Sequence, residues 1–167
     1  MNCYFNPYWP SNPYQPQLAE AIRSEGVSVE TGRTLKDLGT RSAAYGQELL
    51  HLHWLPVAGH HPRQFASWLM FSRRLSRLRR QGWPLVWTAH NVVPHESKMP
   101  ALDLWLSRSV ARLANGIICH SDSARAELVS RLQITDATKI RVIPHGHYID
   151  SYPNLLKPSE CRSRLYL

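Results

Sequence analysis

The chain has 167 residues, 43% of them hydrophobic and 19% charged, which is enough to bury the core of one domain. The formal net charge is +8 and arginine outnumbers lysine sixteen to four. This balance indicates either planar contacts with phosphate or carboxylate groups or a basic surface without a specific partner. Three widely spaced cysteines argue against a disulfide framework and a CxxC zinc site. Because the sequence has no secretory signal and no run of roughly 20 apolar residues, we expect a cytoplasmic protein that does not span a membrane.

Strand-prone and helix-prone segments alternate along the chain. A loop rich in proline and aromatic residues covers residues 6–16, and residues 31–47 are polar and ambiguous. In chain order, the patterns predict strand 2–5, helix 17–25, strands 27–30 and 48–55, helix 63–81, strand 85–90, helix 100–114, strand 116–120, helix 123–132 and strand 140–143. This alternation is typical of an α/β domain with one Rossmann-like parallel sheet flanked by helices. We expect this domain to occupy residues 1–153, with a tail or linker over residues 154–167.

The predicted helix 63–81 has two contrasting faces. Its apolar residues share one side at helical spacing, namely Trp68, Phe71, Leu75 and Leu78. The opposite side is basic, with Arg73, Arg77 and Arg80. This basic side is either ordinary solvated surface or, together with Arg74, a face for anionic lipid headgroups. In both interpretations the apolar side packs on the sheet.

Histidines follow four of the apolar strands at the points where the strands should end. These residues are the pair His51 and His53, then His90, His120 and His145. Since ligands of open α/β sheets bind outside the carboxyl ends of the strands, we expect the histidines to line one rim. A rim of imidazoles and hydroxyls with few acids suits an oxygen-rich or anionic ligand.

Each candidate has a structural alternative. His90 could pack on neighbouring aromatic residues instead of binding a ligand, although its polar strand end favours a function. The His-x-His pairs could chelate a metal, but zinc sites need further ligands at recognisable spacing, so we expect no metal. Ser121 and Ser123 could act as nucleophiles, phosphate contacts or helix caps, and we expect caps. Neither the dinucleotide-binding glycine fingerprint nor a P-loop is present.

The order of motifs resembles the N-terminal domain of GT-B glycosyltransferases of the family 4 type. The similarity rests on five segments in order, Asn12-Pro13-Tyr14-Gln15, His51-Leu52-His53-Trp54, Trp87-Thr88-Ala89-His90-Asn91, Cys119-His120-Ser121 and Val142-Ile143-Pro144-His145-Gly146-His147-Tyr148. It covers nearly the whole chain. The resemblance implies a retaining glycosyltransferase of polysaccharide or glycolipid synthesis. It also implies that this chain forms the acceptor-side half, and that the donor-binding domain is not included. The chain alone is therefore expected to be inactive.

The resemblance also assigns roles to residues. His90 matches the histidine that approaches the transferred sugar, which makes it the candidate catalytic residue. Candidate substrate-binding residues are Asn12, Tyr14, His53, Asn91, Ser121, His145 and Gly146. Relatives usually carry Pro-Asn-Gly where His145-Gly146 stands. Their first loop often has glycines that admit a diphosphate, and Asn12-Pro13-Tyr14 replaces these here.

The resulting expectation is transfer of a sugar from a nucleotide-sugar donor to a saccharide or lipid-linked acceptor. No tightly bound cofactor and no nucleic-acid partner are expected. The enzyme would be peripheral at the inner face of an anionic membrane, held in part by Arg73, Arg74, Arg77 and Arg80. Two alternatives are a basic module that binds nucleic acid or anionic lipid, and a metal hydrolase built on the His-x-His pairs.

Overall fold

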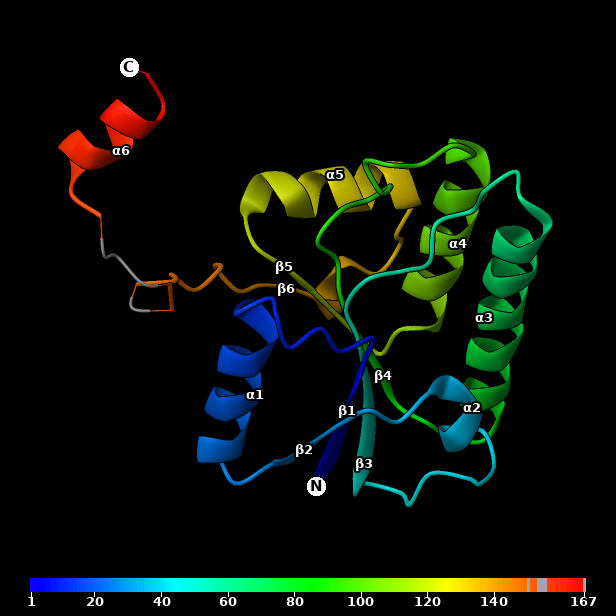
Figure 1. The fold of residues 1–167 in the computed structure, drawn as a ribbon. Helices are drawn as coiled ribbons and strands as arrows, with labels where there is room; N and C mark the ends of the chain where they lie inside the picture. Colours follow the sequence, from blue (N-terminus) through cyan, green and yellow to red (C-terminus); the bar gives the residue numbers. More distant parts are fainter. Residues whose placement is uncertain (150, 153–155, 167) are drawn as a thin grey trace.

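Six strands form one parallel sheet in the computed structural model, which describes residues 1–149, 151–152 and 156–166 (Figure 1). The strands are β1 (Asn2–Asn6), β2 (Ser28–Thr31), β3 (Glu48–Leu52), β4 (Leu85–Thr88), β5 (Gly116–Cys119) and β6 (Ile140–Val142). Their order across the sheet is β2-β1-β3-β4-β5-β6, and every neighbouring pair is parallel. The predicted α/β Rossmann-like fold is thus confirmed, and its strand order reverses between β1 and β3.

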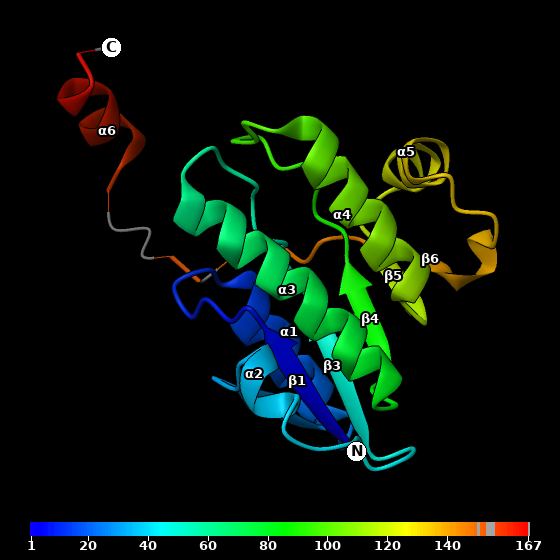
Figure 2. The ribbon, with the colours of Figure 1, turned by 90° about the vertical axis from the view of Figure 1, so that its right-hand side faces the viewer.

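Helices cover the two faces of the sheet unequally. They are α1 (Tyr14–Ser24), α2 (Leu35–Leu38), α3 (Pro62–Arg80), α4 (Pro100–Leu113), α5 (Asp122–Leu132) and α6 (Pro158–Arg164), and a 3₁₀ turn spans Ala137–Lys139. Helix α1 lies on one side of the sheet, whereas α2, α3 and α4 lie on the other (Figures 1 and 2). Right-handed crossovers explain this placement, because the chain leaves β1 toward β2 and then turns back toward β3. Within the described ranges, no helix has both the length and the apolar character needed to cross a bilayer.

Alternating strand residues divide the core into two parts. On β1, Tyr4 points to the side of α2 and α3, whereas Cys3 and Phe5 point to the side of α1. The larger core lies under α2 to α5 and is anchored by the fully buried Trp83 and Trp87. Because both sides of β1 and β3 are buried, the ends of these strands are held rigidly beneath the loops that follow them.

Helix boundaries differ from the predicted ones at the first loop. Helix α1 begins at Tyr14, three residues before the predicted start. Asn12 Oδ1 accepts a hydrogen bond from the Tyr14 backbone N–H at 3.0 Å, which satisfies one of the free donors of the first turn. Pro16 fits here because first-turn residues have no intrahelical partner for the N–H that proline lacks. Strand β3 ends at Leu52 instead of residue 55, and the short helix α2 lies in the segment that was ambiguous.

The predicted domain boundary at residues 153 and 154 lies outside the described residues. After it, Pro158–Arg164 forms α6, which stands away from the sheet and its helices in both views (Figures 1 and 2). The side chains of this helix are exposed apart from the half-buried Cys161.

The four arginines of α3 that were expected to face a membrane fall into two groups. Arg73, Arg77 and Arg80 are exposed, as the two-faced pattern predicts. Arg74 is half-buried and lies about 100° around the helix from Arg73. It therefore belongs to the flank of the helix that adjoins α2, and not to the exposed basic stripe.

A charged cluster ties down the amino-terminal end of β3, far from the strand ends that carry histidines. The buried Glu48 carboxylate accepts hydrogen bonds from the Tyr4 hydroxyl at 3.0 Å, from the Ala44 N–H at 2.8 Å and from the Arg41 guanidinium. Arg41 also lies over the Trp83 ring, 5.1 Å from its centroid. The hydrogen bond from Arg41 lowers the pKa of Glu48 from 4.5 to about 2.

Glu48→Gln should lower the free energy of unfolding at pH 7 by about 2 kcal/mol, because a charge-assisted network becomes a neutral one. Since the folded-state pKa is depressed, the contribution of Glu48 is complete above pH 4.5 and is lost as the pH falls toward 2. Urea denaturation at several pH values measures it, with the exposed Glu30→Gln as the matched control. An equal effect of both substitutions at pH 7 would contradict this role.

Candidate functional site

A row of histidines crosses the carboxyl edge of the sheet from β3 to β6. The ring centroids of His53 and His90 are 6.1 Å apart, those of His90 and His120 are 5.3 Å apart, and those of His120 and His145 are 5.1 Å apart. This spacing follows from the separation of adjacent parallel strands, which is about 4.8 Å. Each histidine follows its own strand at the same level, so four segments distant in sequence contribute to one site.

Tyr14 packs against this row from the start of α1. Its ring centroid lies 6.0 Å from that of His53, 5.0 Å from His90, 5.5 Å from His120 and 4.8 Å from His145. The side chain is buried, and burial raises the pKa of its hydroxyl while a hydrogen bond to Thr88 acts in the opposite direction. The early start of α1 therefore has a consequence for the site, because it brings Tyr14 onto the histidines.

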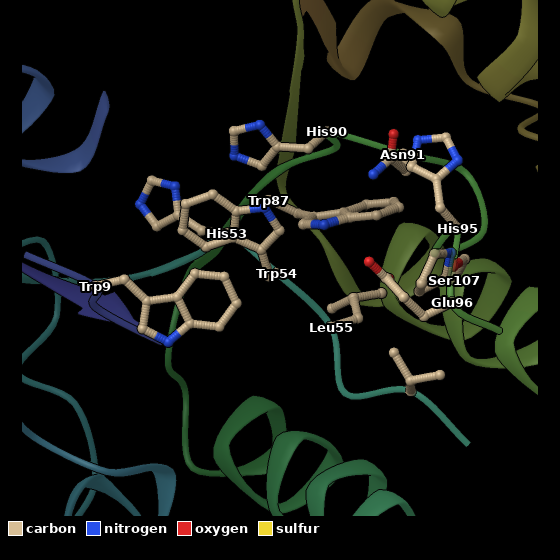
Figure 3. A pocket seen from close by; sticks show the side chains of 12 residues that line it. Trp9, His53, Trp54, Leu55, Trp87, His90, Asn91, His95, Glu96 and Ser107 are labelled. Carbon is tan, nitrogen blue, oxygen red and sulfur yellow. The ribbon is translucent and has the colours of Figure 1, made fainter. Parts of the chain in front are cut away.

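A cavity of about 260 Å³ opens beside His53 and His90, at the carboxyl ends of β3 and β4 (Figure 3). Ligands of open α/β sheets usually bind outside the carboxyl ends of the strands. Three rings are stacked at its wall, with centroids 4.4 Å apart for Trp9 and Trp54 and 4.6 Å apart for Trp54 and His90. The lining consists of Trp9, His53, Trp54, Leu55, Val57, Trp87, His90, Asn91, Pro94, His95, Glu96 and Ser107.

Hydrogen bonds fix the outer members of the row. The Nδ1–H of His120 donates to the Ile143 carbonyl at 2.9 Å, which directs Nε2 inward. The Nδ1–H of His145 donates to the Gly146 carbonyl at 2.7 Å, and its Nε2 accepts from the Tyr148 hydroxyl at 3.0 Å. These contacts place a proton on the Nδ1 atom of each ring, since a carbonyl can only accept.

Several buried ring nitrogens have no hydrogen-bond partner among the described residues. They are both nitrogens of His53 and the Nε2 atoms of His90 and His120. By contrast, the deeper His51 is satisfied through Nε2 and the Thr88 hydroxyl, 2.8 Å apart. Buried polar atoms without partners are costly, so a cluster of them beside a cavity indicates atoms that hydrogen-bond to a ligand.

Burial keeps the inner histidines neutral. It lowers the pKa from 6.5 to about 3 for His51, to about 2 for His53 and to about 4 for His90, and the neighbouring histidines act in the same direction. At neutral pH these rings donate and accept hydrogen bonds without carrying charge. They are therefore better suited to hydroxyl groups than to a bare anion. Of the two ligand classes that the sequence indicated, oxygen-rich or anionic, the uncharged rings favour the oxygen-rich one.

The remaining candidate residues have identifiable local roles. Ser121 is the N-cap of α5, and its Oγ accepts from the Ala124 N–H at 3.1 Å. The expected capping role is confirmed for Ser121 but not for Ser123, whose hydroxyl lies 2.9 Å from that of Ser121. Asn91 is exposed at the cavity, and Asn12 is occupied with the start of α1. Gly146 is exposed, and a Cβ at that position would meet no atom within 4 Å, so the described fold itself does not require glycine there.

The His-x-His pairs do not build a metal centre within the part of the chain that the structure describes. No group of three or more His, Cys, Asp or Glu side chains is arranged there to hold an ion. The His51 and His53 rings stack with centroids 4.3 Å apart, and His51 Nε2 is already bonded to Thr88. His147 Nδ1 accepts from the Ile149 N–H at 3.3 Å.

Three residues that shape the cavity were not among the predicted site residues. Trp9 and Trp54 belong to the aromatic loops after β1 and β3, and their abundance of aromatic residues was the available signal. The buried Asp103 accepts hydrogen bonds from the Ala58 N–H at 2.7 Å and from the Ser97 hydroxyl, so it joins the loops after β3 and β4. Nothing in the local pattern of the helix indicated this long-range role.

Comparisons with known proteins show which family the sequence matches. Residues 57–150 match the family described as Glycosyltransferase Family 4, and this segment includes His90, Ser121 and His145. Two curated relatives from Xanthomonas campestris pv. campestris, both named GDP-mannose:glycolipid 4-beta-D-mannosyltransferase, are 27% identical to the chain over 158 residues. The match covers 93% of this chain and 41% of each relative, so the chain spans about two fifths of their length.

Acidification should destabilise the fold through the neutral histidines. Below pH 6.5 the unfolded chain binds protons that the buried His53 and the half-buried His90 do not, so stability falls with pH until each folded-state pKa is reached. Each such histidine contributes a slope of at most about 1.4 kcal/mol per pH unit.

Urea denaturation at pH 7.5, 6 and 5 measures this slope. His53→Leu should reduce the slope by up to the contribution of one histidine. His60→Leu, a change at an exposed histidine, should leave the slope unchanged. A slope that is the same in both variants would mean that His53 is protonated in the folded state.

Proposed function

Because this chain belongs to glycosyltransferase family 4, we propose that it forms the acceptor-side half of an enzyme that transfers a sugar from a nucleotide-sugar donor to an acceptor hydroxyl. The observation that carries the proposal is the row of histidines along the carboxyl edge of the sheet, in which the neutral His53 and His90 line the cavity and have free ring nitrogens. The names of the two relatives suggest GDP-mannose as the donor and a glycolipid as the acceptor. The donor's nucleotide would be held by residues beyond this half.

His90 is the proposed catalytic residue, since it occupies the middle of the row and lines the cavity. Its free Nε2 would hydrogen-bond the sugar near the reaction centre. Transfer requires stabilisation of a departing diphosphate and of an oxocarbenium-like sugar, chiefly by positioning and by preorganised dipoles. A neutral imidazole serves this purpose, because it orients a hydroxyl without adding a second positive charge beside the sugar.

The neighbouring candidates would shape the acceptor cleft. His53 lines the cavity beside His90, Tyr14 packs against both rings, and Ser121 and His145 follow the next two strands. Asn91 would contact substrate from the open side. We assign Asn12 and Gly146 the supporting part of shaping the loops at either end of the row, and we expect no tightly bound cofactor. The relatives' names do not support the retaining stereochemistry that the resemblance implies, because transfer of the α-linked mannose of GDP-mannose into a β linkage inverts the anomeric centre.

In a protein that includes the donor-binding part, His90→Gln should reduce the rate of sugar transfer on the order of 100-fold while changing the melting temperature little. The physical reason is the loss of a hydrogen bond to the reacting sugar without removal of an internal bond, since His90 Nε2 has no described partner. Transfer is measured with radiolabelled GDP-mannose and a glycolipid acceptor, and the matched control is the exposed His60→Gln.

Full transfer by a folded His90→Gln variant would remove His90 from the mechanism. The 167-residue chain alone should not turn over donor under the same conditions. Turnover by that chain at the rate of the complete protein would overturn the division into two halves.

We also propose that the exposed stripe of α3 holds the enzyme on an anionic membrane. Arg73, Arg77 and Arg80 share one face, opposite the residues that pack on the sheet. Each basic side chain near such a surface contributes about 1 kcal/mol, so the triple Arg→Gln variant should bind anionic vesicles about 100-fold more weakly.

Vesicle sedimentation at low and high salt measures this attachment. The control replaces three exposed arginines elsewhere, Arg33, Arg125 and Arg162, and thus makes the same change in net charge. If both triple variants lose binding equally, the stripe on α3 has no special part in it.

A further inference from the structure

An apolar groove leads away from the histidine cavity toward α3. Its volume is about 200 Å³, and its lining is Asn6, Pro7, Trp9, Trp54, Leu55, Pro56 and Phe71. Trp9, Trp54 and Leu55 line both concavities, so the stacked tryptophans form the wall between them. Figure 3 shows Trp9 and Trp54 side by side at this edge of the cavity. A ligand held at His90 would therefore continue over the tryptophans into the groove.

A third concavity of about 180 Å³ continues the same path. It shares Asn6, Pro56 and Phe71 with the groove, and its other lining residues are Thr34, Leu35, Ser67 and Arg74. The path thus begins at neutral imidazoles, passes aromatic and proline rings, and ends at a guanidinium flanked by hydroxyl-bearing side chains. A ligand that follows the path would thus meet uncharged hydrogen-bonding groups first, apolar rings next and a positive charge last.

Arg74 is available at the end of the path. Its described polar contact is a long one, 4.0 Å from the Met70 sulfur, and it takes part in neither of the salt bridges found among the described residues. No acidic side chain lines this concavity. A half-buried guanidinium without a carboxylate partner is suited to bidentate contact with a phosphate group.

The tryptophan wall is suited to a sugar ring. Trp9 is 48% exposed although it stacks on Trp54, so a large aromatic surface stays accessible at the groove. One side of a pyranose ring presents mainly C–H groups, which pack on the electron-rich face of an indole. Proline and leucine side chains complete the apolar lining, and the polar hydroxyl groups of the ring would face the open side.

From these observations we infer that the path from His90 to Arg74 is an acceptor track for a glycosyl phospholipid, with a pyranose ring against Trp9 and Trp54 and the phosphate group at Arg74. This inference rests on the proposed function, because it places the acceptor hydroxyl at the histidine row. It assigns Arg74 to substrate, and leaves the exposed stripe of Arg73, Arg77 and Arg80 for the membrane. The lipid chain would leave the track beside that stripe.

Binding of small probes to this chain tests the track without any transfer reaction. The probes are octyl glucosyl phosphate, octyl glucoside as the match without phosphate, and octyl phosphate as the match without sugar, all below their micellar concentrations. Isothermal titration calorimetry gives the affinities. The indole N–H resonances of Trp9 and Trp54 report whether the ring lies on the wall.

Arg74→Gln should lower the affinity for octyl glucosyl phosphate about tenfold, because one charge-assisted contact is lost. The affinity for octyl glucoside should change less than twofold. Arg77→Gln, the same change on the exposed stripe, should affect neither probe. Trp9→Ala should lower the affinity for both sugar probes about fivefold, as expected for a lost stacking contact. The matched control is Trp105→Ala, since Trp105 is 49% exposed and lies outside the track.

The inference is overturned if Arg77→Gln weakens binding as much as Arg74→Gln, because the effect would then be general charge. It is equally overturned if octyl phosphate binds as tightly as octyl glucosyl phosphate, or if the Trp9 and Trp54 resonances do not move. Trp9→Phe, which keeps an aromatic ring, should retain most of the affinity and so separates stacking from disturbed folding. Normal probe binding in a complete protein that transfers no sugar would refute the proposed function and leave the track intact.

Discussion

The site depends on the alignment of four parallel strands whose carboxyl ends meet at one edge of the sheet. Parallel neighbours hold the residues after each strand at the same height, and the register pairs β3, β4, β5 and β6 in sequence. A histidine after each strand therefore has the next histidine beside it, and Tyr14 closes the row from α1. The resulting crowding excludes water from the rings, and this desolvation makes His53 and His90 neutral. The neutral state of these two histidines therefore depends on the packing of the whole sheet edge and not on any single local motif.

The uncharged histidines and the charged arginines of this domain are suited to different chemical groups. The net charge of +8 suggests at first that phosphate binding dominates the surface. The inner histidines His53 and His90 are instead uncharged, and the arginines of the α3 stripe and the half-buried Arg74 lie away from them. A ligand that carries both sugar and phosphate can therefore be oriented, because its two chemical parts meet different partners. A uniformly basic cleft would hold the same ligand in either direction.

The elements that were predictable were those with a strong local pattern. The two-faced spacing of α3 and the β-branched runs before His90 and His120 identified a parallel α/β fold, and the shared rim followed from the strand ends. Residues that act across large sequence separations could not be found in this way. Asp103 bonds to Ala58 and Ser97 from the middle of a helix, and Tyr14 reaches the row only because Asn12 and Pro13 start α1 early. Arg74 differs from Arg73 and Arg77 in its angle around α3. This angle makes Arg74 half-buried because α2 packs beside that flank of the helix.

The position of Asp103 shows how the outer wall of the cavity is kept in shape. The loops after β3 and β4 carry Trp54 and His90, whose rings stack with centroids 4.6 Å apart. Flexible loops would not hold such a stack, since each ordered loop residue costs conformational entropy of about 1–2 kcal/mol. The buried carboxylate accepts one hydrogen bond from each loop, so a single side chain on the rigid helix α4 fixes both. The wall of the cavity is thus held in place by a residue that does not line the cavity itself.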